Sequence, residues 1–435
     1  MHRPRWSAGS GEAKCGGMVK SIEIRVPGDK SLSHRALIFA SLGEGVSQVR
    51  GVLRSQDVES TAEVLRRLGA DIPGLCDDLQ IRGSGLHGFR RPSARLDCGN
   101  SGTTTRLMAG ILAACPFSSQ LVGDASLSRR PMRRVAKPLT AMGARLEFAG
   151  TDGLPMTVHG GSLRGVEWRN EVASAQVKSA ILLAGLVGGV TVSVNEPTRS
   201  RDHTERMLIA LGVRVDIAGT RVTLRESHAL PPLDMRVARD PSSAAFFVAL
   251  AAAHAGLEIV LPEVCLNETR TGFLAAATRM GASIAIEPTG SEGGEPVGTI
   301  RARAGELRGI SVEPADVPAM IDEIPLLACL AAVASGETVI RGAGELRVKE
   351  SDRIAAVAAN LHALGVHTEE HGDGLRIHGT SAPLRGRVHA FADHRVAMAF
   401  GILGALPGNR ITIDDPAAVD ISYPTFWDDL RKATA

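Results

Sequence analysis

The sequence of 435 residues is poor in aromatic side chains, which make up 3% of it, and Tyr423 is its only tyrosine. Proteins that bind single-stranded nucleic acid stack successive bases on aromatic rings. The formal net charge of +2 provides no global basic field either, so any cationic site has to be local. These two absences argue against a nucleic-acid partner.

The sequence also lacks long hydrophobic runs and paired cysteines. No run of about 18 uninterrupted apolar residues occurs, so no membrane span is predicted. The six cysteines are scattered, without a C-x-x-C pair or a histidine spacing that indicates zinc, and they are interpreted as reduced thiols. Residues 1–17 have no apolar core and are predicted to be a disordered extension rather than a signal peptide. We therefore expect a cytoplasmic protein.

The composition is that of a large globular protein. Hydrophobic residues make up 44% of the chain and charged residues 22%, which are ordinary values for globular domains. A chain of this length is too long for one ordinary hydrophobic core, so two or more domains are expected.

One helical pattern recurs along the chain with a period of about 70 residues. Each copy is an amphipathic helix, a glycine at its C-terminal stop and a short β-branched strand. The glycines are Gly69, Gly143, Gly212, Gly281 and Gly365.

A second helix recurs six times and is hydrophobic nearly all round, which predicts that it is buried. With the short strands between them, the two helices predict an α/β protein of six βαβαββ-like units. The six copies are SHRALIFASLGEG, GTTTRLMAGILAA, SAQVKSAILLAGLVGG, PSSAAFFVALAAAHAG, MIDEIPLLACLAAVASG and DHRVAMAFGILGA.

Polar and cationic residues gather at the starts of these buried helices. Free backbone N–H groups and the positive end of the helix dipole favour anions there. Capping explains the Ser, Asn, Thr and Asp residues, but it does not explain Lys30, Arg35, Gln176 and Arg395. If the units pack around two pseudo-threefold axes, these helix starts converge on one anionic ligand.

Six ordered motifs together resemble the 5-enolpyruvylshikimate-3-phosphate (EPSP) synthase family. They are PGDKSLSHRAL, DCGNSGTTTRL, GDASLSRRPM, SRDHTERM, RVKESDR and DHRVAMAF. The resemblance runs from about Met18 to the last helix. It implies an inside-out α/β fold of two domains with three units each. One domain is discontinuous, formed by residues 18–26 and 240–435, and residues 27–239 form the inserted domain.

The resemblance implies transfer of the enolpyruvyl group of phosphoenolpyruvate to the 5-hydroxyl of shikimate 3-phosphate, with release of phosphate. The reaction is an addition and elimination through a tetrahedral intermediate, in the shikimate pathway to chorismate and the aromatic amino acids. It implies no metal, no organic cofactor and a monomeric protein. Members with an N-x-G-T motif, as here around Gly102, are inhibited by glyphosate.

The resemblance also assigns binding residues. Those expected to hold shikimate 3-phosphate are Lys30, Ser31, Arg35, Ser174, Gln176, Ser200, Asp322 and Lys349. Those expected around phosphoenolpyruvate are Lys30, Gly102, Arg130, Gln176, Arg353 and Arg395. Two positions depart from the family pattern. Ala175 stands where many members have a second serine, and the stretch with Ile421 and Ser422 lacks a lysine that some members carry.

Three residues are candidates for proton transfer, because the reaction delivers one proton to C3 and removes another from the hydroxyl. Cations around Asp322 would favour its charged form, which suits a base. Glu350 is the candidate acid for the methylene carbon, and Lys30 is an alternative at the bridging oxygen. For Glu350, a purely structural pairing with Arg353 is the competing interpretation.

Two other functions are weighed against this one. The related transferase that acts on UDP-N-acetylglucosamine usually carries a reactive cysteine before its R-P pair, but GDASLSRRP has none. Cys115 lies earlier, in an apolar helix end, and is expected to be inert. An ATPase module or a non-catalytic phosphate binder is the second alternative, but no G-x-x-x-x-G-K-[ST] motif is present.

Closure of the two domains is a further expectation. Lys30, Arg35 and Arg130 belong to one domain, and Lys349, Arg353 and Arg395 belong to the other. Their mutual repulsion favours an open form that a dianionic substrate closes.

Overall fold

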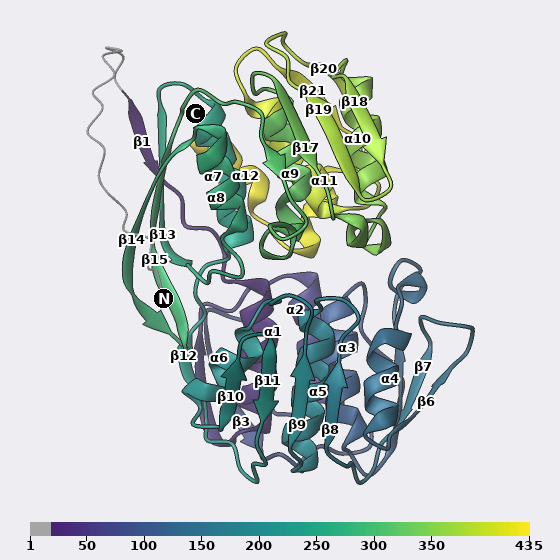
Figure 1. Cartoon of the computed structure of the whole chain (residues 1–435). Helices are drawn as coiled ribbons and strands as arrows, with labels where there is room; N and C mark the ends of the chain where they lie inside the picture. Colours follow the sequence, from purple (N-terminus) through teal and green to yellow (C-terminus); the bar gives the residue numbers. More distant parts are fainter. Residues whose placement is uncertain (1–18) are drawn as a thin grey trace.

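The computed structural model describes residues 19–435, so the predicted disordered extension of residues 1–17 lies outside the described residues. The described chain forms two lobes with separate hydrophobic cores (Figure 1). The core of lobe 1 consists of residues between Leu32 and Ala238, joined by Cys265 and Val297. The core of lobe 2 combines Ile24 and Val26 with residues 244–433. The domain boundaries at residues 26/27 and 239/240 stay a prediction.

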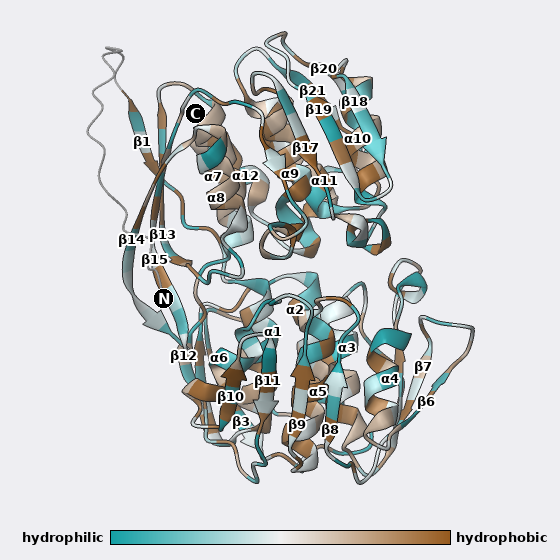
Figure 2. Cartoon of the chain, in the orientation of Figure 1, coloured by the Kyte–Doolittle hydropathy of each residue, from teal (hydrophilic) through white to brown (hydrophobic). Residues whose placement is uncertain are grey.

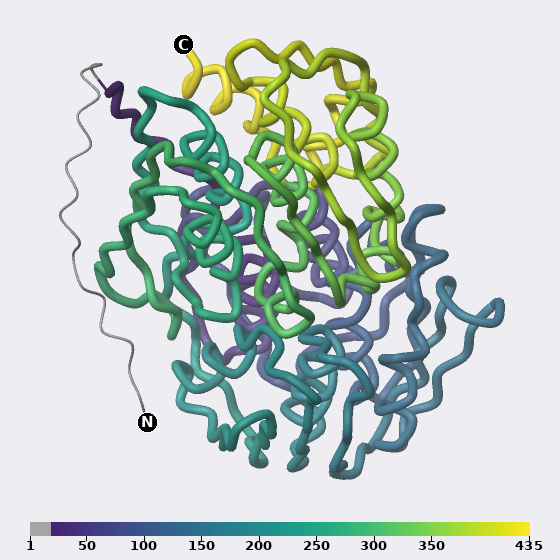
Figure 3. Tube along the Cα trace, turned by 45° about the horizontal axis from the view of Figure 1, so that its top comes forward, coloured from purple at the N-terminus to yellow at the C-terminus, as the bar shows by residue number. Residues whose placement is uncertain are grey.

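The chain passes between the lobes twice, and the two passages lie side by side. Gly28 and Arg239 form an antiparallel bridge. The Asp29 N–H donates to Ala238 O at 2.8 Å, and the Asp240 N–H donates to Pro27 O at 3.0 Å. Figure 3 shows the result: the later, green-to-yellow part of the chain gathers at one end of the molecule and the blue-to-teal part at the other.

Six small sheets surround the two cores, corresponding to the six predicted units. In lobe 1 they are β12 (Asp234–Arg236), β2 (Glu44–Arg50) and β3 (Asp78–Ser84); β4 (Leu96–Asp97), β5 (Ser118–Val122), β7 (Met156–His159) and β6 (Arg145–Phe148); and β8 (Val166–Arg169), β9 (Val192–Asn195), β11 (Arg221–Leu224) and β10 (Val215–Ala218). In lobe 2 they are β1 (Lys20–Glu23), β13 (Leu257–Cys265), β15 (Glu295–Arg303) and β14 (Ser283–Glu292); β16 (Ser311–Val312), β17 (Glu337–Ile340), β19 (Gly374–His378) and β18 (Thr368–His371); and β20 (Arg385–Val388) and β21 (Arg410–Ile413).

Each four-stranded sheet has the same pairing pattern. Its first two strands are parallel, as β8 and β9 are, and the remaining pairs are antiparallel, as in β9–β11 and β11–β10. Two units differ from the predicted pattern. The first borrows its parallel strand, β12, from the end of lobe 1. The last has only β20 and β21, because a 3₁₀ turn and a helix follow β21 instead of two further strands.

Six helices are largely buried within the lobes. They are α1 (Lys30–Leu42), α3 (Gly102–Ala113), α5 (Ala175–Gly188), α7 (Pro241–Ala253), α9 (Ile324–Ala331) and α11 (His394–Ala405). Every residue from Pro241 to Ala252 of α7 is buried. Helices α3 and α5 pack so closely that a Cβ at Gly110 would lie 2.2 Å from the backbone oxygen of Ala180.

The six remaining helices are partly exposed. They are α2 (Gln56–Arg67), α4 (Arg133–Ala141), α6 (His203–Ala210), α8 (Gly272–Met280), α10 (Arg353–Ala363) and α12 (Phe426–Thr434). The predicted glycine stops are present after five of them, for example at Gly69 (φ 95°) and Gly281 (φ 111°). A left-handed residue at this place satisfies the last carbonyls of a helix, and glycine adopts it without steric cost.

The sheets present one face to the helices and the other to solvent. Along the strands, hydrophobic and hydrophilic residues alternate (Figure 2), as expected when one sheet face is buried. The helices therefore lie inside the lobes and the sheets outside. None of the helices within residues 19–435 combines the length and apolar character required to cross a membrane.

Candidate active site

The site lies where the two lobes meet, at the starts of several helices. Three ion pairs there join lobe 1 to lobe 2, one of them between Arg134 Nη1 and Glu345 Oε2 at 2.9 Å. Arg130 Nη1 lies 3.2 Å from Glu350 Oε1, and Arg201 Nη2 lies 2.7 Å from Asp322 Oδ2. The candidate residues of the two lobes are therefore in direct contact.

Arg353 is the centre of this network. It is the first residue of α10, whose N-cap Asp352 accepts the backbone N–H of Ala355. The Arg353 side chain is 2% exposed. Its guanidinium reaches three carboxylates in lobe 2: Asp322 Oδ1 at 3.2 Å, Glu350 Oε2 at 2.7 Å and Asp393 Oδ2 at 2.8 Å.

Asp322 lies in a short 3₁₀ turn, η3 (Ile321–Glu323), directly before α9. Burial by itself raises the pKa of its carboxyl, but surrounding cations outweigh burial and hold the pKa well below its ordinary value. These cations are, in order of their effect, Lys349, Arg201, Arg395 and Arg353. Asp322 is thus a carboxylate kept ionised by charges from both lobes.

Glu350 has a similar environment. Burial raises the pKa of its carboxyl. Nearby positive charges, chiefly those of Arg353 and Arg130, lower the pKa by more, so that it lies well below its ordinary value. Lys349, next to it in the chain, lies 3.5 Å from Asp322 Oδ1. The charge of Asp322 raises the pKa of Lys349. Burial and the charge of Arg353 lower this pKa by a larger amount, so the net shift is downward.

A second cluster lies at the start of α3, around Gly102. Arg130 Nη2 donates to Asn100 Oδ1 at 2.6 Å. Arg106 Nη1 donates to Gln176 Oε1 at 2.6 Å, and Gln176 Nε2 donates to Thr103 Oγ1 at 3.0 Å. The expected residues Gly102, Arg130 and Gln176 are therefore brought together with an arginine that the sequence analysis did not single out.

Arg106 could have been found by its spacing. It follows Gly102 by four residues on a helix, so both lie on the same face. Burial, followed by the charges of Arg134 and Arg130, lowers the pKa of Arg106 to about 9. Among the described residues its buried Nε has no hydrogen-bond partner.

Gly102 leaves room for these arginines. A Cβ at this position would lie 2.8 Å from Arg106 Nη1 and 3.5 Å from Arg130 Nη1. The first distance is shorter than real Cβ contacts allow, so any side chain here would displace Arg106.

Two of the three expected residues of α1, Lys30 and Arg35, have side chains that are already paired within the protein. Lys30 Nζ lies 2.9 Å from Asp57 Oδ2. Arg35 donates to Thr204 Oγ1 at 2.7 Å, to Ser179 Oγ at 2.9 Å and to the Ser31 backbone oxygen at 2.9 Å. Burial lowers the pKa of Arg35 to about 10. In this arrangement Arg35 holds the first turn of α1 against α5 and α6.

Two of the three expected serines, Ser174 and Ser200, share one buried carboxylate, that of Glu196. The Ser174 N–H donates to Glu196 Oε1 at 3.0 Å, and the Ser200 hydroxyl donates at 2.7 Å to Glu196 Oε2. Lys178, 1% exposed, pairs with the same carboxylate at 2.8 Å. Because its proton points to Glu196, the Ser200 hydroxyl would have to rotate to donate to a phosphate.

Two remaining expectations concern the C-terminal part. Arg395 Nη1 lies 3.3 Å from Glu323 Oε1 at the end of η3. Ile421 and Ser422 lie at the end of the 3₁₀ helix η5 (Pro416–Ile421), followed by the buried Tyr423. Cys115 is also buried, and burial raises the pKa of its thiol to about 12, as expected for an inert cysteine.

Comparisons with known proteins agree with this geometry. The family model of EPSP synthase (3-phosphoshikimate 1-carboxyvinyltransferase) matches residues 17–430. A 3-phosphoshikimate 1-carboxyvinyltransferase of Xanthomonas euvesicatoria is 49% identical, over 97% of this chain and 94% of the relative. One of Sulfurihydrogenibium sp. is 48% identical, over 96% of this chain and 98% of the relative.

Solved structures show the same fold. EPSP synthase of Acinetobacter baumannii superimposes with a TM-score of 0.83 at 40% identity, covering 96% of both chains. The enolpyruvyl transferase NikO of Streptomyces tendae gives a TM-score of 0.75 at 18% identity over 96% of both chains, which bears on the fold alone. The predicted inside-out α/β fold is confirmed, and the chain belongs to the EPSP synthase (3-phosphoshikimate 1-carboxyvinyltransferase) family.

Proposed function

We propose that this enzyme transfers the enolpyruvyl group of phosphoenolpyruvate to the 5-hydroxyl of shikimate 3-phosphate through the residues at the junction of its lobes. The observation that carries this mechanism is Asp322, a carboxylate kept ionised among cations from both lobes. An ionised carboxylate is a proton acceptor, and excess cations are what two anionic substrates require.

The arginines of the Gly102 cluster are proposed to hold phosphoenolpyruvate. Arg106 Nη1 and Arg130 Nη1 both lie close to the space that the missing Cβ of Gly102 leaves, at 2.8 Å and 3.5 Å from the position of that atom. Guanidinium groups match the planar carboxylate and the phosphate of this substrate with paired hydrogen bonds. Arg353 and Arg395 would approach from lobe 2, so that both lobes contact one substrate.

Shikimate 3-phosphate is proposed to lie between the starts of α1 and α5 and the Asp322–Lys349 pair. Ser174 caps α5, where backbone N–H groups and the helix dipole favour a phosphate. Ser31, Gln176 and Ser200 add neutral donors on the same side. This pose directs the 5-hydroxyl toward Asp322.

The chemical step requires two proton transfers. Asp322 accepts the proton of the 5-hydroxyl while the hydroxyl oxygen bonds to C2 of phosphoenolpyruvate, and a proton is added to C3. The tetrahedral intermediate then expels phosphate as C3 loses a proton, which restores the double bond. Glu350 is the proposed donor to C3. Substrate anions that pair with Arg353 and Arg130 would weaken the charges that lower the pKa of Glu350, and the carboxyl would then bind a proton.

Lys30 is the alternative proton donor, at the oxygen that bridges C2 and phosphorus. Its ammonium is held by Asp57 at 2.9 Å. The proposed mechanism uses no metal and no organic cofactor.

The test is a comparison of acceptors. The purified chain is incubated with phosphoenolpyruvate and either shikimate 3-phosphate or UDP-N-acetylglucosamine, and in a separate reaction with ATP alone, and released phosphate is measured. Phosphate release that depends on shikimate 3-phosphate supports the proposal. Release with the nucleotide sugar alone, or release by ATP hydrolysis, would support one of the two alternatives instead.

We also propose that the chain acts as a monomer in the cytoplasm. The proposed site draws all its residues from one chain. Among the described cysteines, Cys98, Cys115, Cys265 and Cys329 are buried as free thiols, which suits a reducing compartment. Light scattering after gel filtration checks the oligomeric state, and a dimer at micromolar concentration would contradict it.

A further inference from the structure

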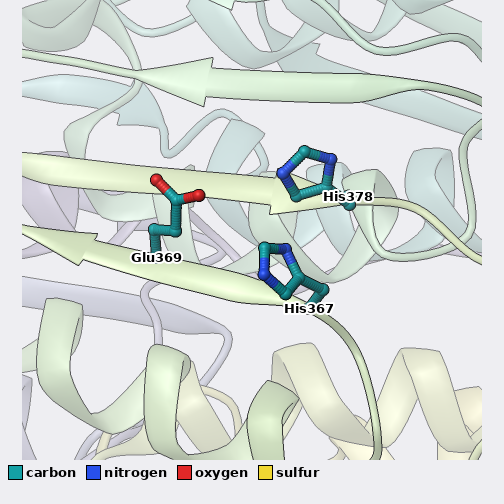
Figure 4. A group of neighbouring side chains, drawn as sticks. All are labelled: His367, Glu369 and His378. Atoms are coloured by element: carbon teal, nitrogen blue, oxygen red, sulfur yellow. The ribbon is translucent and has the colours of Figure 1, made fainter.

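Two histidines and a glutamate meet on the outer sheet of lobe 2, on strands separate from the proposed active-site residues. His367 directly precedes β18, Glu369 lies on β18, and His378 ends β19. Figure 4 shows the two imidazole rings beside each other, with the carboxylate next to them. One ligand atom from each residue lies within 4.8 Å of the other two.

The strand register explains this arrangement. β18 and β19 are antiparallel, with Thr368 opposite Ile377, so His367 lies opposite His378. The His378 N–H donates to His367 O at 3.0 Å, and the ring centroids are 4.6 Å apart. Glu369 follows His367 by two residues and therefore projects from the same sheet face.

The backbone that carries the three side chains is anchored in the core. Leu375 and Ile377 of β19 point to the opposite face and are 1% and 0% exposed. Ligands on a rigid element lose little backbone freedom when they bind a metal. His367, Glu369 and His378 remain accessible from solvent, since the first two are exposed and the third is half-buried.

The donor set selects the class of ion. Two imidazole nitrogens and one carboxylate oxygen suit divalent transition metals, whereas Mg²⁺ and Ca²⁺ prefer oxygen ligands alone. We propose that His367, Glu369 and His378 bind one divalent transition-metal ion, with Zn²⁺ as the reference probe. Water would occupy the remaining coordination positions.

Arg376 determines how tightly the ion is held. Its Nε lies 3.3 Å from Glu369 Oε2, and its Nη1 lies 2.9 Å from Glu337 Oε2. Glu337 Oε2 is in turn 3.5 Å from His378 Nε2. The guanidinium orients both carboxylates, but its charge repels a cation. The site is therefore expected to bind a metal ion more weakly than a closed structural zinc site does. Loss of the Arg376 charge should raise its affinity for the ion.

The test uses the full chain after dialysis against a chelator. Titration calorimetry with Zn²⁺ should show one site that is weakened at least tenfold in His367→Ala and in His378→Ala, and less in Glu369→Gln. Bound Co²⁺ should give visible absorption bands that both histidine variants lose. His228→Ala is the matched control, because His228 is an exposed histidine whose Nε2 lies 3.1 Å from Glu226 Oε1. The affinity of this variant for Zn²⁺ should equal that of the unaltered chain. The Arg376→Gln variant should bind Zn²⁺ more tightly than the unaltered chain.

A second measurement separates this site from the active site. Zn²⁺ should raise the thermal unfolding midpoint of the unaltered chain, because an ion that binds only the folded state stabilises it. It should have no such effect on the double variant H367A/H378A, and enolpyruvyl transfer should be the same in both proteins without metal. Zn²⁺ affinity that survives in a folded double variant, or that saturating shikimate 3-phosphate abolishes, would overturn the proposal. So would an unaltered chain that binds no Zn²⁺ at millimolar concentration.

Discussion

Two networks of charged residues join the lobes, one beside the chain crossings and one at the proposed active site. Beside the crossings, Arg270 lies 2.8 Å from Asp29 and 3.1 Å from Asp240. His203 Nδ1 lies 2.7 Å from Glu295 Oε1 in the same network. The side chains of Arg270, Asp29 and Glu295 are between 0% and 2% exposed, whereas those of Lys349, Asp322 and Glu350 are 31%, 16% and 15% exposed.

The two networks also differ in the sign of their excess charge. Beside the crossings, carboxylates outnumber arginines: Asp29, Asp202, Asp240 and Glu295 face Arg199, Arg206 and Arg270. At the site, cations outnumber carboxylates: Lys30, Arg106, Arg130, Arg201, Lys349, Arg353 and Arg395 face Asp57, Asp322, Glu323, Glu350 and Asp393. A largely buried, internally paired network is suited to holding the lobes together. A partly exposed network with excess positive charge is suited to receiving anions.

Asp322→Asn should produce the largest effect on activity. A positioned base contributes roughly 10²–10⁴-fold to a rate, so kcat should fall by that factor while the variant stays folded and keeps most of its affinity for shikimate 3-phosphate. The unfolding midpoint should fall as well, because the lowered pKa of Asp322 means that its charge stabilises the folded protein. Steady-state kinetics and thermal unfolding measure the two effects. Near-normal turnover in the folded variant would remove Asp322 from the mechanism and would leave the site network without a catalytic base.

Signals that act over a few residues of the sequence were sufficient to predict the helix ends around this site. Capping residues at helix starts, among them Ser174 and Asp240, and helix stops such as Gly69 act within a few residues, and the structure contains all three. Their effect depends on the backbone near them, which the order of residues specifies directly.

The partners of the charged groups could not be predicted in the same way. Asp57, Arg201 and Glu323 pair with Lys30, Asp322 and Arg395 across long stretches of sequence. The expected repulsion between the domains counted cations only, but Arg201–Asp322 and Arg130–Glu350 attract across the same junction. The pair His367 and His378 likewise depends on strand register, which spacing along the chain does not reveal.

Arg270→Met should produce the largest effect on stability. Removing one partner of a buried ion pair leaves the other charge uncompensated and typically costs 3–5 kcal/mol; here both Asp29 and Asp240 lose their partner. Urea unfolding measures the loss. Arg279→Met is the matched control, because its pair with Asp316 is 44% and 36% exposed, and such pairs contribute about 0–1 kcal/mol. Equal losses in the two variants would refute the distinction between buried and exposed pairs.

Asp202→Asn tests the crossing network through pH. Burial raises the pKa of Asp202, but hydrogen bonds from Asn267 and Arg206 and the charge of Arg206 outweigh it and lower the pKa to about 2. An unfolded aspartate titrates near 3.9, so the shift corresponds to about 2–3 kcal/mol of stability. Because the folded pKa is the lower one, this contribution is complete above pH ~4 and is lost as the pH falls toward 2.

The difference in urea midpoint between the unaltered chain and Asp202→Asn should therefore shrink from pH 7 to pH 3. A difference that is independent of pH would show that Asp202 contributes through packing rather than through its charge.

Gly102→Ala should produce the smallest effect. It tests whether the site distinguishes two of its ligands, phosphoenolpyruvate and glyphosate. Glyphosate inhibits this family by occupying the phosphoenolpyruvate site, and here the added methyl would lie 2.8 Å from Arg106 Nη1. The guanidinium must shift, which disturbs the hydrogen bond that its Nη1 donates to Gln176 at 2.6 Å. Crowding of this kind costs about 1 kcal/mol when a side-chain end can shift, which corresponds to roughly fivefold in affinity. We expect the inhibition constant for glyphosate to rise more than the KM for phosphoenolpyruvate, because the longer inhibitor, with three chain atoms between its acidic groups instead of two, leaves less space for the displaced arginine. Gly372→Ala, where an added Cβ meets no atom within 4 Å, should change neither constant. Equal increases in both constants would mean that the methyl acts on the shared anion contacts of Arg106 and not on the space beside Gly102.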